Sequence, residues 1–343
     1  MKTVLIAVLL LAGMVVSNGA EPAAGFRGDF QIGCNVAWFE GAYNHDFGAN
    51  PDHPYWGTTF DAAKYKETLE GLSKHGAKLL RVWAYEEEEG WKFGSDGKLE
   101  GLDNQFLDNW KKFLAESVPE GVKLHVSLLD SNAYSPKSGK SERAVKLFVE
   151  GKDTYIEKVL KPFVQMLAGS SKVVSIDLIN EPEAMVKGGD ANYTDSGLSW
   201  DEVRAFIKDS AAACKEAAPG LQVACSSGWH GLGNIKSGKF DSLGLDFLEA
   251  HMYDDNPDIP PAGSVNALPI LLGEYGQATE SSDDKLQLDV TRKFLAGTKS
   301  LGYLGALMWH HGDLKNPDHL SLRKSDGSWR PAADVMLEAA KDW

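Results

Sequence analysis

Two apolar stretches of this chain each run into a glutamate: SIDLINEPE contains Glu181 and PILLGEYG contains Glu274. If both stretches are strands of a parallel barrel, the two glutamates stand at carboxyl ends, where side chains point into the barrel mouth. Carboxylates that face each other there can hydrolyse a glycosidic bond, one as proton donor and the other as nucleophile. A separation of ~5–5.5 Å predicts retention of configuration, and ~6.5–9.5 Å predicts inversion. On the residues alone, Glu183 is an alternative acid.

Alternation along each strand is the feature expected to turn both glutamates inward. A period of two places Glu181 on the same face as Asp177 and Ile179. The same period places Glu274 on the face that carries Ile270 and Leu272. The alternative is that both are ordinary strand-end glutamates on the solvated rim of the barrel.

The elements that must position these residues alternate along the chain. Strand-like runs are Gln31–Trp38, Ala77–Tyr85, Val122–Asp130, Val173–Glu181, Leu221–Ser227, Phe247–Tyr253, Pro269–Glu274 and Tyr303–Trp309. Helical spacing marks Thr59–His75, Asn104–Ser117, Asp153–Ala168, Trp200–Ala218, Asp284–Ser300 and Arg330–Lys341. Eight strand-then-helix units predict an α/β fold, a closed (β/α)8 TIM barrel in a single domain.

Two crossovers and one loop depart from a regular barrel. Residues 228–246 and 254–268 are Gly/Pro-rich, so the fifth and sixth crossovers are predicted to be stunted. An open doubly wound sheet is the alternative, but GCNVAWFEG after the first strand is not a glycine-rich phosphate loop. Residues 40–58 are predicted to form an insertion at the barrel mouth.

Charge and targeting signals limit the partners. The net charge is −14, and Lys and Arg form no cluster interleaved with aromatic residues, so nucleic acid and anionic membranes are poor partners. Residues 1–20 have a lysine, an apolar run and small residues, as a signal peptide does, which leaves 21–343 as the domain. A membrane anchor is the alternative for that run. We therefore expect a secreted protein, extracellular or periplasmic, and a monomer.

Cysteines and acidic residues leave further alternatives open. Cys214 and Cys225 are candidates for a disulfide or for two buried thiols, and Cys34 is left over. The run YEEEEG, which ends at Gly90, is typical of a solvated face, and near a barrel mouth it could instead contact hydroxyls or a cation.

Five motifs resemble those of one enzyme clan. LLRVWAY with Arg81, IDLINEPE with Asn180 and Glu181, AHMYDD with His251 and Tyr253, LLGEYG with Glu274 and LMWHH with Trp309 follow the order and strand positions of the clan A glycoside hydrolases. The chain looks like family 5, with its β-mannanase and endoglucanase branches. The resemblance covers nearly all of the chain after residue 20, and it is specific at the Asn-Glu-Pro and Gly-Glu-Tyr-Gly strands.

The resemblance implies a role for each motif residue. Glu181 would be the general acid/base, Glu274 the nucleophile, and Asn180 a partner of the sugar 2-hydroxyl. Arg81 would be the charge partner of Glu274, with pairing to Asp177 or Glu249 as the alternative. The implied substrate contacts are His251 lining the site, Tyr253 bonded to Glu274, Trp309 as a stacking platform, and Trp83 and Trp229 as secondary contacts. Asp130 is a loose match to an inward polar residue of the family.

The resemblance also implies a substrate and a mechanism. It favours double displacement on a β-1,4-linked polysaccharide or oligosaccharide, with β-mannan before β-glucan because RVWAY resembles the β-mannanase pattern. This mechanism requires no cofactor and no metal.

Two rival functions use the same barrel. A metal-dependent hydrolase is suggested by five histidines, but the expected His-x-His pair is missing from the first strand. These histidines are His230, His251, His310, His311 and His319. A carbohydrate-binding barrel without activity is the second rival.

Overall fold

The computed structural model describes residues 29–39, 45–134, 141–188, 197–228, 230–312 and 318–342. The predicted signal peptide and Trp229 lie outside these ranges. Within them, no helix is both long enough and apolar enough to cross a membrane.

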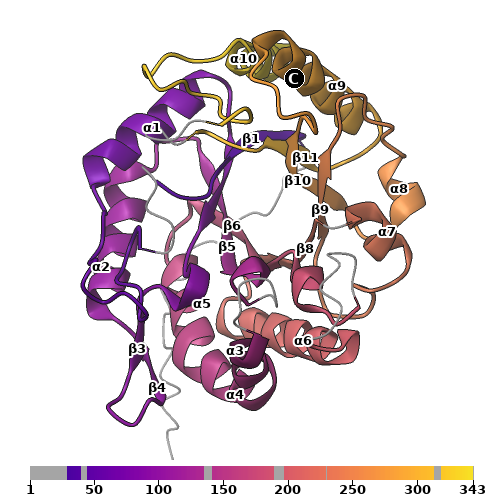
Figure 1. The fold of residues 1–343 in the computed structure, drawn as a ribbon. Coiled ribbons are helices and arrows are strands. Elements are labelled where there is room, and N and C mark those ends of the chain that lie inside the picture. The colour runs from indigo at the N-terminus through magenta and orange to yellow at the C-terminus, as the bar shows by residue number, and fades with distance from the viewer. Residues whose placement is uncertain are drawn as a thin grey trace, which may run out of the picture.

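Parallel strands form a barrel at the centre of the molecule, with helices around it (Figure 1). The strands are β1 (Gln31–Val36), β2 (Leu79–Trp83), β5 (Lys123–Asp130), β6 (Val173–Asn180), β7 (Gln222–Ala224), β8 (Ser226–Ser227), β9 (Leu248–Tyr253), β10 (Ile270–Gly276) and β11 (Gly305–Met308). Their order is β7-β6-β5-β2-β1-β11-β10-β9-β8. Because only Cys225 separates β7 from β8, these two form the predicted fifth strand, and the sheet closes on itself. The (β/α)8 barrel is confirmed, and the open-sheet alternative is wrong.

The predicted helices are present, with ends shifted by a few residues. They are α1 (Ala62–Lys74), α2 (Asn104–Lys112) continued by η2 (Phe113–Ser117), α4 (Lys152–Tyr155) with η6 (Ile156–Leu160) and α5 (Lys161–Ala168), α6 (Trp200–Ala217), α9 (Asp284–Ser300) and α10 (Ala332–Asp342). Side chains define several starts: Asp61 caps α1, and Ser199 forms a capping box with Glu202 on α6. The fifth and sixth crossovers hold only α7 (Gly231–Lys236) and α8 (Ala262–Val265), as predicted.

The loop after β2 contains structure that the sequence did not predict. An antiparallel hairpin, β3 (Trp91–Phe93) and β4 (Leu99–Leu102), projects from the ring of helices (Figure 1). Across from it lie α3 (Ser141–Val145) and η5 (Lys146–Glu150). The short helices η1 (Glu86–Glu88), η3 (Ser131–Tyr134) and η7 (Pro182–Met185) follow strands at the mouth.

The acidic run is not the solvated face that was expected. Glu86, Glu88 and Glu89 are each at most 4% exposed. The Glu89 carboxylate accepts hydrogen bonds from the backbone N–H groups of Phe47 and Gly48, so it binds the loop before α1 to the loop after β2. All three cysteines are buried free thiols, and the disulfide alternative is therefore wrong.

The barrel interior is layered. At the bottom is a small apolar cluster of Leu79, Val174, Ala224, Phe247, Leu271 and Leu307, contributed by six strands or their entries. Above it lies a polar layer centred on Arg81. The main apolar core lies between the outer faces of the strands and the helices. This arrangement holds a polar site on a rigid floor at the carboxyl ends of the strands.

Candidate active site

Arg81 is the centre of the polar layer and is fully buried. From β2 it forms ion pairs with Asp177 (Nη2 to Oδ2, 2.7 Å), Glu249 (Nε to Oε1, 3.0 Å) and Glu274 (Nη1 to Oε1, 2.7 Å). Arg81 therefore pairs with Glu274, the predicted partner, and also with Asp177 and Glu249, the two alternatives. Burial alone would lower the pKa of Arg81, but the three carboxylates outweigh it and raise that pKa. Arg81 therefore remains a fixed cation beneath the mouth.

Amide side chains hold the same guanidinium. Asn35 accepts from Nη1 at 3.1 Å, and Asn180 accepts from Nη2 at 2.8 Å. Asn180 also donates to Asp130 at 3.1 Å. Because Asn180 is bound on both sides, its amide is held at the edge of the site, where the resemblance places a sugar hydroxyl. Asp130 thus positions Asn180.

Glu274 points inward because of an irregularity in β10. Leu271 belongs to the bottom layer inside the barrel, whereas Leu272 belongs to the outer core. The expectation that Glu274 shares the Leu272 face is therefore wrong: the pairing register shifts between Leu272 and Glu274, and this turns the glutamate into the barrel. Gly273 is required there, since a Cβ would lie 1.7 Å from Oε1 of Glu249.

Glu274 is almost fully buried and accepts several contacts. Tyr253 donates its hydroxyl to Oε2 at 2.6 Å, while Arg81 holds Oε1. Burial raises the pKa of the Glu274 carboxyl, and the charges of His251 and Arg81 together with the Tyr253 hydroxyl reduce this rise without cancelling it. The carboxylate is thus oriented through both of its oxygens.

An unusual backbone conformation at Glu181 directs its side chain into the site. Ile179 belongs to the outer core and the next residue, Asn180, contacts Arg81, so the predicted face shared by Asp177, Ile179 and Glu181 is wrong. Glu181 instead has φ 50° and ψ 55°, in the left-handed region, which directs its side chain to the mouth. Its N–H donates to Ser226 Oγ at 3.2 Å.

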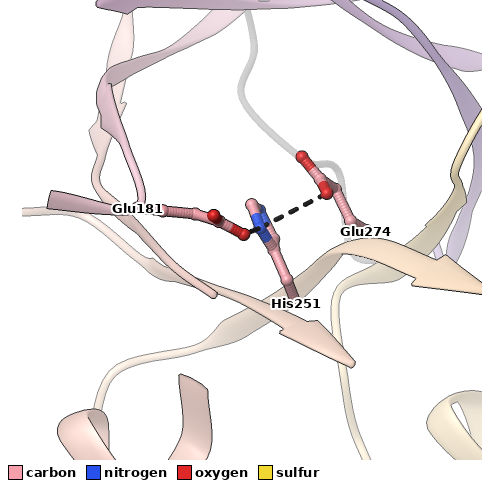
Figure 2. A group of neighbouring side chains, drawn as sticks. All are labelled: Glu181, His251 and Glu274. Atoms are coloured by element: carbon pink, nitrogen blue, oxygen red, sulfur yellow. Dashed lines mark hydrogen bonds and ion pairs between the residues drawn. The ribbon is translucent and has the colours of Figure 1, made fainter. Parts of the chain in front are cut away.

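His251 lies between the two glutamates (Figure 2). Its Nδ1 is 2.7 Å from Oε1 of Glu181 and 3.5 Å from Oε2 of Glu274, and its Nε2 is 3.4 Å from Glu249. Burial alone would lower the pKa of His251, but the carboxylates outweigh it and raise the pKa to about 10. One carboxylate oxygen of each glutamate and a ring nitrogen of His251 lie within 4.8 Å of one another. The two carboxyl groups are therefore closer together than the ~6.5–9.5 Å that a pair with a water molecule between them needs.

Several supporting residues had no role in the sequence prediction. His125 binds Glu249 (Nε2 to Oε2, 2.7 Å) and Ser175 (2.8 Å), and Asn35 binds Arg81. Burial would raise the pKa of Glu249, but Arg81 and His125 hold it well below its usual value. A polar residue inside an apolar strand is the signal for these positions, and it was present at both Asn35 and His125.

Aromatic side chains line one side of the site. Trp309 is half-buried and meets Trp38 and Trp83 edge to face, with ring centroids 5.6 Å and 6.0 Å apart. Trp83 lies over the Arg81 guanidinium at 5.0 Å and is 5% exposed. The Tyr253 ring is 38% exposed, although its hydroxyl contacts Glu274. Trp309, Trp38 and Tyr253 are thus the members of this set that offer ring surface to a ligand.

Several known proteins that are similar to this chain in sequence or fold are mannanases. A mannan endo-1,4-β-mannosidase of Mytilus edulis is 26% identical over 348 positions, which cover 87% of this chain and 89% of the relative. The X-ray structure of the β-mannanase of blue mussel, Mytilus edulis, superposes with a TM-score of 0.67 and 22% identity, over 91% and 92% of the two chains. GH5_18 of Streptomyces cattleya gives 0.67 and 12%, over 92% and 81%. No family model matches the chain.

The chain is thus similar in sequence to a mannan endo-1,4-β-mannosidase and in fold to family 5 enzymes. The resemblance inferred from its motifs is confirmed. The structure also distinguishes Glu181 from Glu183, the alternative acid. Glu183 is fully buried and accepts a hydrogen bond from the Ser227 hydroxyl at 2.9 Å. Burial, together with the charge of Glu181, raises the pKa of Glu183 to about 8. Of the two, Glu181 is the one beside Glu274.

His310 and His311 do not belong to the group formed by Glu181, His251 and Glu274. His310 contacts Asp318 at 3.3 Å, and His311 is buried beside Phe39, where burial lowers its pKa to about 3. The Glu181, His251 and Glu274 set has the geometry to hold a cation. A metal at this position would compete with the proton for the ring nitrogen of His251, so the metal-dependent alternative requires His251 to be neutral.

Proposed function

We propose that this protein is an endo-acting β-mannanase that hydrolyses β-1,4-linked mannan with retention of configuration. The observation that carries the proposal is the pair of carboxylates from β6 and β10, whose oxygens lie within 4.8 Å. That spacing suits the retaining mechanism, since an inverting pair needs room for a water, at ~6.5–9.5 Å. The mannanase names of the relatives support mannan as the substrate.

The first chemical step uses the two glutamates in different protonation states. Oε2 of Glu274 attacks the anomeric carbon, and the leaving oxygen takes a proton from Glu181. In the second step Glu181 removes a proton from water, which attacks the same carbon and releases Glu274. Arg81 and Tyr253 hold the attacking carboxylate, and Trp309 offers a ring face to the sugar in the cleavage subsite.

The charge distribution supports this division of roles. Two cations, Arg81 and the His251 imidazolium, face the carboxylates of Asp177, Glu181, Glu249 and Glu274. The excess of negative charge favours retention of a proton in the site, which a general acid needs. Arg81 contacts Glu274 directly, and its positive charge favours the ionised form of this nucleophile.

The setting of the activity follows from the same assignment. A mannan polymer is an extracellular substrate, and residues 1–20 have the composition of an export signal. We place the protein outside the cell, acting as a monomer on a neutral polysaccharide. The negative net charge is compatible with such a partner.

The test is reducing-sugar release from β-mannan, β-glucan and xylan, with anomer detection by NMR. We expect release from β-mannan with the β-anomer formed first, and loss of activity in both Glu181→Ala and Glu274→Ala. With an aryl β-manno-oligoside, whose leaving group departs without protonation, azide should restore turnover in each variant and give glycosyl azides of opposite configuration. Glu183→Gln is the matched control and should stay active. Binding of mannan without turnover in the unaltered protein would instead favour the non-catalytic rival.

A further inference from the structure

A cavity lies beside the hairpin, apart from the catalytic residues. Its volume is about 920 Å³, within the usual range for ligand sites. Its walls come from the hairpin, from α3 and η5, and from the loop before α1, and none of the proposed catalytic or substrate-binding residues lines it. Figure 1 shows the hairpin at the edge of the molecule, away from the barrel centre.

One wall of this hairpin cavity is aromatic, and one of its rings packs against a second aromatic side chain. The Trp91 ring stacks on Tyr155, with centroids 5.4 Å apart and planes at 29°, so its orientation is fixed. Trp91 is 6% exposed, and its indole Nε1 has no hydrogen-bond acceptor among the described residues. Phe93, two residues on, is 38% exposed. The cavity thus combines an exposed ring with a buried donor in need of an acceptor.

Two of the three cations on the polar wall are paired with carboxylates. Arg143 donates Nε to Oε1 of Glu88 at 2.7 Å and Nη2 to the other oxygen, while Nη1 meets Asp52 at 2.5 Å. Lys98, also in the lining, pairs with Asp96 at 2.7 Å. Arg143 and Lys98 thus have carboxylate partners, and Lys146 is the one further cation among the lining residues. The paired groups present fixed donors and acceptors to hydroxyl groups.

We propose that the hairpin cavity is a second glycan site, which binds a neutral segment of the mannan chain outside the catalytic cleft. The aromatic rings of the cavity suit the C–H faces of pyranose rings, which pack on aromatic side chains. The ion-paired side chains suit the sugar hydroxyls, which both donate and accept hydrogen bonds. The lining loops follow β2 and β5 at their carboxyl ends, so the cavity is at the same end of the barrel as the active site. This inference rests on the proposed function for the identity of the glycan.

Binding is tested in a chain that cannot turn over its ligand. In Glu274→Gln, calorimetry with mannohexaose should show two classes of site, and hydrogen exchange should show protection of residues 91–102. Adding Phe93→Ala should weaken one class by about tenfold or more, since it removes the exposed ring on which the sugar would pack. The protection of 91–102 should vanish with it. The second variant is Trp91→Phe, which keeps an aromatic ring at this position and removes the indole N–H donor.

Activity separates this cavity from the catalytic site. Phe93→Ala alone should hydrolyse mannotetraose within about twofold of the unaltered protein, and release less sugar from insoluble mannan. The control is Tyr55→Ala, an exposed aromatic ring that does not line the cavity. Unchanged hexaose binding and exchange in both Phe93→Ala and Trp91→Phe would overturn the proposal. A lack of mannan hydrolysis by the unaltered protein would instead contradict the proposed function, and Phe93-dependent binding of mannohexaose would still support the cavity.

Discussion

At the scale of single residues, Tyr253 and Glu274 are the sharpest test of the site. Tyr253→Phe removes one hydrogen bond to a charged carboxylate, so kcat/KM should fall by about 10- to 100-fold. The tyrosine hydroxyl stabilises the ionised form of Glu274, whose pKa burial already raises. Its loss should therefore move the acid limb of the kcat/KM profile to higher pH. The measurement is a pH–rate profile on soluble mannan.

Tyr275→Phe is the control for that variant. It removes a hydroxyl from the neighbouring residue, whose ring packs on Phe294 in the outer core. An acid limb at the same pH in Tyr253→Phe and in the unaltered protein would contradict the role given to the hydroxyl.

Gly228 gives a second prediction at this scale, because it leaves the space that Glu181 occupies. A Cβ at this position would lie 1.7 Å from Oε1 of Glu181. Gly228→Ala should displace the carboxylate and lower kcat by about 100-fold, while Tm changes little. Gly263→Ala adds a methyl group where no atom lies within 4 Å, and it should leave kcat unchanged. Equal activities of the two variants would show that the position of Glu181 is not limiting.

At the scale of elements, Glu89 joins two loops at the mouth. Its carboxylate accepts from two backbone N–H groups, and burial raises its pKa to about 8. Glu89→Ala leaves two buried donors unpaired and should lower the free energy of unfolding by about 2 kcal/mol or more. Glu89→Gln keeps an acceptor and removes the titration. Urea unfolding of the three proteins at pH 5 gives the comparison.

The same variants predict a pH dependence. Between pH 4.5 and about 8 the unfolded Glu89 ionises while the folded residue keeps its proton, so its contribution to stability falls as pH rises. Glu89→Gln should therefore lose less stability than the unaltered protein between pH 5 and pH 8. Parallel losses in both proteins would mean that Glu89 is ionised in the fold.

At the scale of the whole molecule, the periodic features of the sequence predicted the barrel well. All eight predicted strands and all six predicted helices exist, because apolar spacing reports which face of an element is buried. The hairpin between residues 91 and 102 was missed, since its strands are short and Phe93 and Lys92 face solvent. The burial of Glu89 was missed because its partners are backbone groups about 40 residues away.

The candidate site was predicted in its residues and mispredicted in its geometry. Glu181 and Glu274 come together as expected, but each does so by breaking the alternation that suggested it. A left-handed residue turns Glu181 inward, and a register shift at Gly273 turns Glu274 inward. Neither irregularity follows from period-two reasoning, because both depend on what the neighbouring strands leave room for, as the Glu249 carboxylate beside Gly273 shows.

Buried charge across the barrel predicts how stability of the whole protein varies with pH. The pKa of His251 rises from 6.5 to about 10, so its contribution is complete below pH 6.5 and is lost as pH rises towards 10. The raised pKa of Glu183, about 8, acts in the same direction from pH 4.5 upward. Glu249 has a depressed pKa, so its contribution is lost as pH falls below 4.5. Stability should therefore be greatest near pH 5.

Thermal unfolding between pH 4 and pH 10 measures this dependence. We expect Tm to fall in two overlapping phases above pH 5, the later one between pH 6.5 and 10. His251→Gln removes the imidazolium that holds Glu181 and Glu274 together, so its Tm should be lower at pH 6 and should lack the later phase. A Tm that stays constant from pH 6.5 to 10 in the unaltered protein would mean that His251 is neutral in the fold. Glu181 would then face Glu274 without a cation between them, and the acid would need another source of the charge balance that the retaining mechanism requires.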